Sequence, residues 1–385
     1  HNTMSDNKPK FEAGLAGIVA GQTAVGEVTQ TSLRYRGYEI ADLAEHSTFD
    51  EVAHLLIHGE LPNAAELKDF RARIQAAMHL PKQVTSAVDA MPNETPPMDV
   101  LRSVVSILGH YDPDAQDNSR PANLRKSERL LGQLACATGY WCRKVGNLPE
   151  IKPDPNAPHG RNLLNMMLGK AASDLAGRVM DGTLVLYAEH EFNASTFTAR
   201  TIASTLADMH AAVTGAIGAL KGPLHGGANE AAMHQFLSIG KPENVEKWFN
   251  ELEAHNKANP TSKRLIMGFG HRVYKHGDHR AAILREWSLQ LSKETGQGHW
   301  IDMADRLQKL MLEKKNIHPN TDYPAAHAYY QMGIPISLYT PIFVCSRVTG
   351  WCAHIMEQYE NNRIIRPSSE YVGVGPREVG AIGKR

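Results

Sequence analysis

Hydrophobic and polar residues alternate with a helical period over most of the chain. Such spacing gathers apolar side chains on one face of a helix. Glycine is a typical stop signal after such a run, because it tolerates a left-handed backbone, and Gly59 ends the first run in this way. The pattern predicts helices over residues 49–57, 64–78, 98–108, 127–145, 182–186 leading into 196–220, 228–237 and 280–291.

Only the beginning of the chain follows a different pattern. Residues 17–21, 24–29 and 32–36 are short runs separated by glycine and polar residues, and they predict three short strands. Segments 112–123 and 149–160 are rich in Pro, Asn and Asp and predict surface loops. The chain shows no internal repeat. The sequence therefore predicts a mostly α-helical fold with a small N-terminal β element.

Composition and charge narrow the classes of function. The 385 residues are 42% hydrophobic, which is enough for a sizeable core in one large domain or two. Lys plus Arg is 41 and Asp plus Glu is 41, a balance that argues against a nucleic-acid or polybasic membrane surface. The first ten residues are polar, no apolar run is long enough to span a bilayer, and the four cysteines form no CxxC pair. We expect a cytoplasmic protein with reduced thiols.

The motif from Leu224 to Glu230 places a histidine in a tight turn between two predicted helices. The positive end of the second helix disfavours imidazolium, so His225 would stay neutral and could donate a hydrogen bond to a developing oxyanion. Gly226 and Gly227 would let a ligand approach the backbone. The alternative is a loop histidine that caps the helix.

A second motif, Met267-Gly268-Phe269-Gly270-His271, combines two glycines with a histidine suited to proton transfer. It lacks the third glycine and the strand-helix unit of a dinucleotide-binding loop. Asp278 suits the N-cap of the next helix, which puts Arg280 in its first turn. There Arg280 is either solvated or bound to an anion.

Two further polar groups border predicted helices. The sequence His190-Glu191-Phe192-Asn193 follows an apolar run, so His190 needs a partner either in the core or from a ligand. Asp322 precedes a helix that begins with proline, and residues in this place usually cap the helix. An Asp322 that instead points into a cleft could act as a general base.

A helix opened by Thr340-Pro341 places Phe343, Arg347, Gly350 and His354 on one face. Arg347 interrupts an apolar run, so its head group either reaches solvent or meets an anion. Arg366 also follows apolar residues, and a bidentate arginine suits a substrate carboxylate. These groups together suggest proton transfer on a small anionic substrate without a metal. Zinc is the competing use of the histidines, but no HExxH spacing is present.

Read in order, these motifs resemble the citrate synthase family, from about Gly14 to Tyr371. The specific matches are residues 224–230, 268–274, 319–322 and 343–347, followed by Arg366-Pro367. The resemblance implies a homodimer with a citrate synthase-like, two-domain helical fold. The large domain would comprise residues 5–226 and 333–385, and the small domain, residues 227–332, would close over the ligands.

The resemblance also implies roles for single residues. Asp322 matches the base that takes the acyl α-proton, His225 the donor to the thioester carbonyl, and His271 the group that polarises and protonates the keto oxygen of oxaloacetate. Coenzyme A enters as a thioester substrate, and neither a tightly bound cofactor nor a metal is expected. The implied oxaloacetate-binding residues are His190, Arg280, Arg347 and, from the second subunit, Arg366, and further implied substrate-binding residues are Phe343 and Asn193. The implied CoA-binding residues are Met267, Gly268, Phe269, Gly270, Lys314 and Lys315.

The acyl-CoA substrate is harder to predict. Residues 186–195 and 342–351 look like the 2-methylcitrate synthase branch, which prefers propionyl-CoA, whereas 270–275 is similar to small bacterial citrate synthases. One methylene in an apolar pocket discriminates by only about 1 to 3 kcal/mol, so dual activity is physically easy. We therefore expect a 2-methylcitrate synthase that also makes citrate.

Four alternatives remain open from the sequence. Within the family they are a dedicated citrate synthase of the tricarboxylic acid cycle and a lyase that runs the carbon–carbon step in reverse. From other classes they are a metal hydrolase that uses His190, His225 and His271, and a helical binding protein without catalysis.

Overall fold

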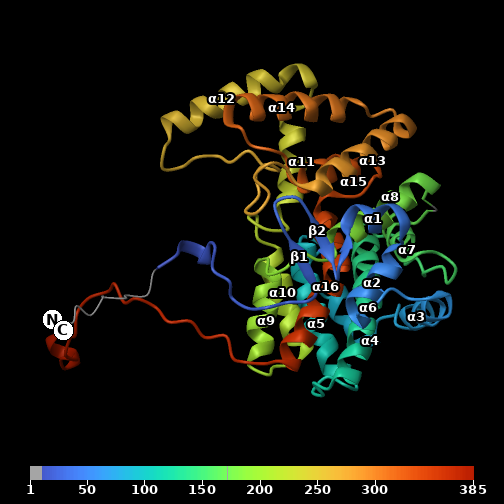
Figure 1. The fold of residues 1–385 in the computed structure, drawn as a ribbon, viewed down its shortest axis with the longest axis vertical. Helices are drawn as coiled ribbons and strands as arrows, with labels where there is room; N and C mark the ends of the chain where they lie inside the picture. The colour runs from blue at the N-terminus through green and yellow to red at the C-terminus, as the bar shows by residue number, and fades with distance from the viewer. Residues whose placement is uncertain (1–10, 171) are drawn as a thin grey trace.

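The computed structural model describes residues 11–170 and 172–385. The polar start of the chain at residues 1–10, and with it residues 5–10 of the predicted large domain, lies outside the described residues. Within the described part, α-helices dominate and one small sheet lies near the N-terminus (Figure 1). The fold class predicted from the sequence is confirmed.

The elements follow one another in this order: β1 Gly26–Val28, β2 Leu33–Tyr35, β3 Tyr38–Glu39, α1 Ile40–His46, α2 Phe49–His58, α3 Ala64–Ala76, α4 Lys82–Asp89, α5 Pro97–Tyr111, α6 Arg120–Val145, α7 His159–Leu168, α8 Asp174–Tyr187, α9 Ala194–Ser204, α10 Met209–Leu220, α11 Ala228–Ile239, α12 Val245–Ala258, α13 His279–Thr295, α14 His299–Lys315, α15 Asp322–Gln331 and α16 Tyr339–Glu360.

The sheet is antiparallel, in the order β1-β2-β3, with Gly26 opposite Tyr35 and Arg34 opposite Glu39. The strands predicted over 24–29 and 32–36 are present but shorter. The strand predicted over 17–21 is wrong, because this segment follows a 3₁₀ turn, pairs with no strand among the described residues and exposes Ile18 and Val19.

Helix boundaries differ from the prediction where capping residues decide them. The continuous helix predicted over 196–220 is broken, since α9 ends at Ser204 and Asp208 caps α10 by accepting from the backbone N–H of Ala211. The loop predicted over 112–123 ends early because Ser119 caps α6 at Arg120. Helices α1, α4, α7, α12 and α14 were not predicted, and α7 begins inside the loop predicted over 149–160.

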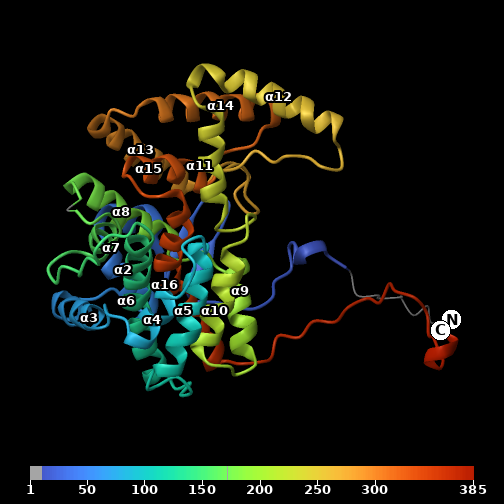
Figure 2. The ribbon, with the colours of Figure 1, turned by 180° about the vertical axis from the view of Figure 1, so that it is seen from behind.

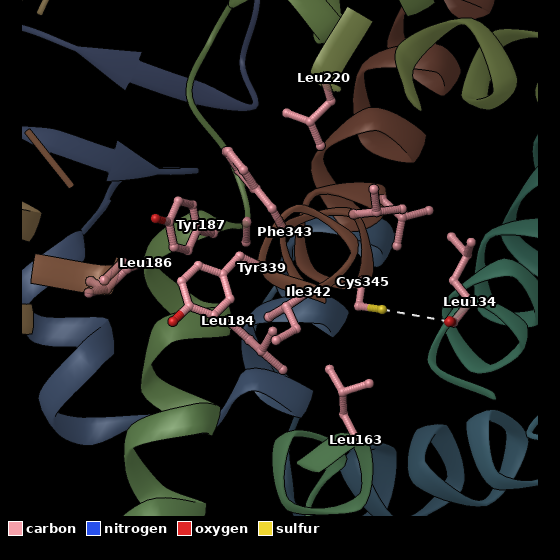
Figure 3. Packing of buried hydrophobic residues seen from close by; sticks show 14 of the residues in the cluster. Leu134, Leu163, Leu184, Leu186, Tyr187, Leu220, Tyr339, Ile342, Phe343 and Cys345 are labelled. Atoms are coloured by element: carbon pink, nitrogen blue, oxygen red, sulfur yellow. Dashed lines mark hydrogen bonds between the residues drawn. The ribbon is translucent and has the colours of Figure 1, made fainter. Parts of the chain in front are cut away.

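Helix α16 lies at the centre of the hydrophobic core. It packs against α2, α6, α8, α9 and α10, and nearly all of its side chains are buried. A helix with apolar residues on all sides is stable only when it is surrounded by other elements. Figure 3 shows Ile342 and Cys345 facing the core from α16, with Phe343 beside Tyr187 of α8. The residues flanking Arg347 are therefore part of the core.

Helices α11 to α15 gather at one end of the molecule, with α12 and α14 outermost (Figure 1). The described residues from 11 toward β1, and residues 366–385 after α16, run away from the body in both views (Figures 1 and 2), whereas Asn362 and Ile365 are still hydrogen-bonded to Ser204 of α9. The predicted division into domains at residues 227 and 332 remains a prediction. None of the helices within residues 11–170 and 172–385 has the length and apolar character needed to cross a membrane.

Candidate active site

The turn between α8 and α9 presents His190. Asn193 caps α9 through its side-chain oxygen, which accepts from the backbone N–H of Thr196 at 3.1 Å. Its amide nitrogen donates to the carbonyl of His190 at 3.3 Å and to that of Glu191 at 3.4 Å. These contacts fix the turn and occupy the hydrogen-bonding groups of Asn193. The structure therefore favours a positioning role for Asn193, and its direct contact with substrate remains a prediction.

A tight turn after α10 presents His225. The backbone N–H of Gly227 donates to the carbonyls of Leu220 and Gly222, both at 3.2 Å. A Cβ at Gly226 would lie 2.6 Å from Cδ1 of Leu220, and one at Gly227 would lie 2.7 Å from the carbonyl oxygen of Lys221. The two glycines are thus required by packing of the turn against itself. The sequence predicts that these glycines let a ligand approach the backbone, whereas the structure explains them by packing within the turn.

The hydrogen bonds of His225 assign its tautomer. Its Nε2 lies 3.3 Å from the backbone nitrogen of Ser195 and 2.8 Å from Oγ of the same residue. A backbone N–H only donates, so Nε2 accepts and the proton sits on Nδ1. Burial, and then the charge of Arg347, lower the pKa of His225 to about 3. His225 is therefore a neutral donor through Nδ1, for which no partner is found in the described part of the chain.

His271 follows a loop in which both glycines adopt left-handed backbone, with φ of 84° at Gly268 and 82° at Gly270. This loop pairs with the segment before α15, since Gly270 N–H donates to the carbonyl of His318 and Asn320 N–H to that of Gly268, both at 2.8 Å. The pairing brings His271 close to the N-terminus of α15.

The tautomer of His271 is the opposite of that of His225. Its Nδ1 accepts from the backbone N–H groups of Val273 at 3.0 Å and Tyr274 at 3.1 Å. The proton of the neutral ring therefore sits on Nε2. Burial and the charge of Arg280 lower the pKa of His271 to about 4. His271 is thus neutral at physiological pH and donates through Nε2.

Asp322 is the first residue of α15, but its side chain does not cap the helix. Its Oδ1 instead accepts from the hydroxyl of Tyr187 at 3.1 Å. Burial raises the pKa of Asp322 to about 7, although the Tyr187 hydroxyl and the charge of Arg280 act in the opposite direction. A carboxyl group with this pKa can both take and release a proton near neutral pH. The geometry favours the general-base interpretation over the cap.

Two arginines lie behind these groups, and both are buried. Arg280 donates from Nε and Nη2 to the carboxylate of Asp278 at 3.0 and 2.9 Å, and Asp278 also accepts from the hydroxyl of Thr321 at 2.7 Å. Arg347 is 2% exposed, donates from Nε to the carbonyl of Tyr187 at 2.6 Å, and has no partner for Nη1 among the described residues. Neither arginine is solvated. The alternative that Arg280 is a solvated first-turn residue is therefore wrong, and so is the alternative that the head group of Arg347 reaches solvent.

The structure brings the predicted catalytic side chains into one cluster. Phe343 connects them, since its ring centroid lies 6.2 Å from that of His225 and 4.2 Å from that of Tyr187. Figure 3 shows Phe343 beside Tyr187, whose hydroxyl in turn donates to Asp322. The guanidinium carbon of Arg347 lies 4.7 Å from the Phe343 centroid. On the other side, the rings of His190 and His271 are 5.1 Å apart, and Arg280 acts electrostatically on both.

Other predicted site residues lie elsewhere. Arg366 is exposed in the segment that runs away from the body, where its Nη1 donates to the carbonyl of Pro367. Lys314 and Lys315 are exposed in the last turn of α14, and Lys315 pairs with Glu253 at 2.9 Å. The backbone of Met267 forms two hydrogen bonds with the side chain of Gln235. Binding of coenzyme A at residues 267–270, Lys314 and Lys315 remains a prediction.

Sequence reasoning missed three residues that orient the cluster: Tyr187, Ser195 and Asp278. Tyr187 ends a buried apolar run, and Asp278 has the position of an ordinary helix cap, so nothing local marks either as part of a site. Ser195 contacts His225 only because α9 folds back toward the turn after α10. Within residues 11–170 and 172–385, no three His, Cys, Asp or Glu side chains are grouped so that they could share a metal ion.

Comparison with known proteins gives consistent matches over nearly the whole chain. Residues 14–368 match the family described as "Citrate synthase, C-terminal domain". The chain is 45% identical to a 2-methylcitrate synthase of Shewanella oneidensis, covering 99% of this chain and all of that protein. It is 39% identical to a citrate/2-methylcitrate synthase of Bacillus subtilis, covering 96% of this chain and 98% of the relative.

The fold comparison agrees with the sequence comparison. A citrate synthase from Thermoplasma acidophilum, solved as a ternary complex with carboxymethyl coenzyme A and oxaloacetate, superimposes with a TM-score of 0.91 at 33% identity. The match covers 98% of this chain and all of that structure. With the motifs, the clustered side chains and the matched length in agreement, this chain belongs to the citrate synthase family.

Proposed function

We propose that this enzyme joins the α-carbon of a short acyl-CoA to the keto carbon of oxaloacetate and hydrolyses the adduct to free CoA and a tricarboxylate. The observation that carries the proposal is the presence of one carboxyl group and two neutral histidines in the same cluster. Asp322 has a pKa of about 7. His225 carries its proton on Nδ1, because its Nε2 accepts a backbone hydrogen bond, and His271 carries its proton on Nε2, because its Nδ1 accepts one.

Each of the three groups has a separate task in the condensation. Asp322 takes a proton from the acyl α-carbon, while Nδ1–H of His225 donates to the thioester oxygen on which negative charge develops. The resulting carbon nucleophile attacks the keto carbon, and Nε2–H of His271 polarises the keto oxygen and protonates the alkoxide that forms. The proton that Asp322 removed then restores neutral His271, so that the carbon–carbon step neither gains nor loses a proton overall. A thioester α-proton is a very weak acid, so removal by a carboxylate requires stabilisation of the oxyanion at the same moment. Water then adds to the thioester carbonyl, and CoA leaves as the thiol.

Oxaloacetate carries two carboxylates, and the site offers positive charge for them. Arg347 and Arg280 are buried within the cluster, and arginine is a natural partner for carboxylates. Nε and Nη2 of Arg280 already pair with Asp278, whereas Nη1 of Arg347 has no partner among the described residues and is free to donate to oxaloacetate. The lowered pKa values of His190 and His271 keep both rings neutral, so they act as hydrogen-bond partners rather than as further charges.

For the acyl group we propose propionyl-CoA as the preferred substrate, with acetyl-CoA also accepted, so that the products are 2-methylcitrate and citrate. The name of the Shewanella relative supports this preference, and the name of the Bacillus relative, which includes both products, supports the dual activity. Release of free thiol from propionyl-CoA and from acetyl-CoA, each with oxaloacetate, tests it directly. Higher kcat/KM with acetyl-CoA would favour the dedicated citrate synthase, and activity lost on chelation would favour the metal hydrolase.

The pKa of Asp322 predicts a pH profile. Only the carboxylate accepts the proton, so kcat/KM should fall about tenfold per pH unit below about 7 and reach a plateau above it. The two histidines are already neutral above pH 5 and add no step in this range. Tyr187→Phe removes the hydrogen bond that favours the carboxylate, so it should move the profile to higher pH. A profile that Tyr187→Phe leaves in place would belong to a different group.

We also propose a cytoplasmic homodimer in which Arg366 completes the site of the partner subunit. Support comes from the segment 366–385, which leaves the body and exposes apolar side chains, including Val372 at 88%. Apolar arms of this kind are typical of surfaces that another subunit covers.

Mixing two inactive variants tests this arrangement. Arg366→Ala and Asp322→Asn should each be nearly inactive at low oxaloacetate. After subunit exchange at equal amounts, half of the dimers are mixed, and each contains one site with both residues intact. Activity should recover to about a quarter of wild type. If Arg366 instead served its own chain, the mixture would stay as inactive as its components.

A further inference from the structure

The proposed reaction leaves one group of buried charges without a role. Glu189, directly before His190, and His354 of α16 are both 0% exposed. Their side chains meet with 2.8 Å between Oε2 of Glu189 and Nε2 of His354. Burial of a carboxylate costs folding free energy unless it is paired and hydrogen-bonded, so the retention of Glu189 in the core points to a role in the site. His354 lies on the same face of α16 as Arg347, about two turns further along.

Arg200 of α9 determines which ring nitrogen of His354 carries the proton. Its Nη1 lies 2.9 Å from Nδ1 of His354, and a guanidinium can only donate. Nδ1 therefore accepts, and Nε2–H donates to Glu189. Arg200 also pairs with Glu357 at 2.7 Å, and the other oxygen of Glu357 accepts from the backbone N–H of Ala24 at 2.8 Å. The carboxylate of Glu189 is thus held by a chain of oriented contacts that begins at α9.

The surrounding backbone is shaped to fit this carboxylate. Oε2 of Glu189 also accepts from the backbone N–H of Glu191 at 3.0 Å, and Glu191 has a left-handed φ of 56°. A Cβ at Gly26 would lie 2.3 Å from that oxygen. One at Gly350 would lie 2.4 Å from the carbonyl of Ala188 and 3.0 Å from Oε1 of Glu189. Two close approaches and one strained residue therefore surround a single side chain.

The same carboxylate is linked to both proposed types of oxaloacetate ligand, to the histidine through the backbone and to the arginine through its charge. Its own backbone leads into His190, whose Nε2 contacts the hydroxyl of Tyr274 at 3.1 Å. Its charge acts on Arg347. Oε1 of Glu189 and Nη1 of Arg347 are both buried without hydrogen-bond partners among residues 11–170 and 172–385. Displacement of Glu189 would therefore disturb His190 and Arg347 together.

We infer that Glu189 and His354 are positioning residues for oxaloacetate. Arg200 orients His354, His354 holds Glu189, and Glu189 fixes the turn that presents His190 beside Arg347. This inference rests on the proposed function, because it assigns these residues to one of the two substrates. A purely structural network would instead affect stability and the amount of active enzyme without distinguishing oxaloacetate from acyl-CoA.

A pair of variants of the full chain tests the inference. His354→Leu removes both hydrogen bonds, whereas His354→Gln can restore an acceptor for Arg200 and a donor for Glu189. We expect His354→Leu to raise the KM for oxaloacetate at least about tenfold and to change the KM for acyl-CoA by less than about threefold. His354→Gln should recover most of the loss. An unchanged oxaloacetate KM in a folded His354→Leu protein overturns the inference, as does an equal rise in both KM values.

A second pair of variants, at Arg200, covers the case in which His354→Leu does not fold. Arg200→Met removes the donor to His354, so it should raise the KM for oxaloacetate more than the KM for acyl-CoA. Arg200→Lys can keep a donor, so the difference between the two KM values should be smaller in this variant. Calorimetric titration with oxaloacetate alone measures the effect without turnover. A wild-type protein that releases no thiol from either acyl-CoA contradicts the proposed function. An active wild type with unaltered oxaloacetate binding in these variants contradicts only the positioning role.

Discussion

Asp322→Asn lowers kcat by about 10² to 10⁴ and leaves oxaloacetate binding intact, if this carboxylate is the base. The range is the usual contribution of a positioned acid or base. Asparagine has nearly the same shape and can still accept a hydrogen bond from Tyr187, but it cannot take a proton. The change also removes a negative charge near Arg280 and Arg347, so oxaloacetate should bind equally well or more tightly.

Stability should not fall in this variant, and the sign follows from the pKa. The folded protein raises the pKa of Asp322 to about 7, so it holds the proton more tightly than the unfolded chain does. Above that pH the ionised group therefore costs folding free energy, and asparagine removes the cost. Thermal unfolding at pH 8 should give a Tm equal to or above that of wild type. Asp302→Asn, at an exposed aspartate in the first turn of α14, is the matched control and should change neither kcat nor Tm.

His225→Ala has the second largest expected effect. Loss of one preorganised donor to an oxyanion reduces kcat by about 10² to 10³ in other enzymes. Because His225 is neutral over the physiological range, the loss should be nearly independent of pH above 5. The measurement is kcat for thiol release at saturating acyl-CoA and oxaloacetate, at several pH values.

His225→Asn separates the hydrogen bond from the ring itself. The asparagine amide nitrogen can occupy a position close to that of Nδ1, so part of the activity should return in this variant. His299→Ala removes an exposed histidine at the start of α14 and should have no effect. Equal activity of His225→Ala and wild type would show that this donor does not act on the developing charge.

Helical periodicity and helix-stop residues were enough to predict the fold class and most long helices. They could not place α9 and α10 as separate helices, because the break depends on a single capping contact from Asp208. They also predicted a strand at 17–21, which pairs with no strand in the described part of the chain. Boundaries and pairing depend on contacts between distant segments, which local patterns do not contain.

The candidate site divides in the same way. His225, His271 and Asp322 stand in distinctive motifs that carry the family resemblance, although the local pattern around Asp322 favours a helix cap that the structure does not contain. Their tautomers and pKa values could not be predicted, since they depend on the backbone N–H groups of Ser195 and Val273 and on the depth of burial. Tyr187 was missed because a tyrosine at the end of an apolar run has the pattern of an ordinary core residue.

The central position of α16 limits how this enzyme can change its substrate preference. Phe343 contributes to the proposed site from a helix whose remaining faces form the core, so a substitution that reshapes the site there also creates a packing defect. Laboratory selection for bulkier acyl groups should therefore require compensating stabilising substitutions when it alters α16. Changes in the loops that present His225 and His271 avoid that linkage and offer the shorter evolutionary route.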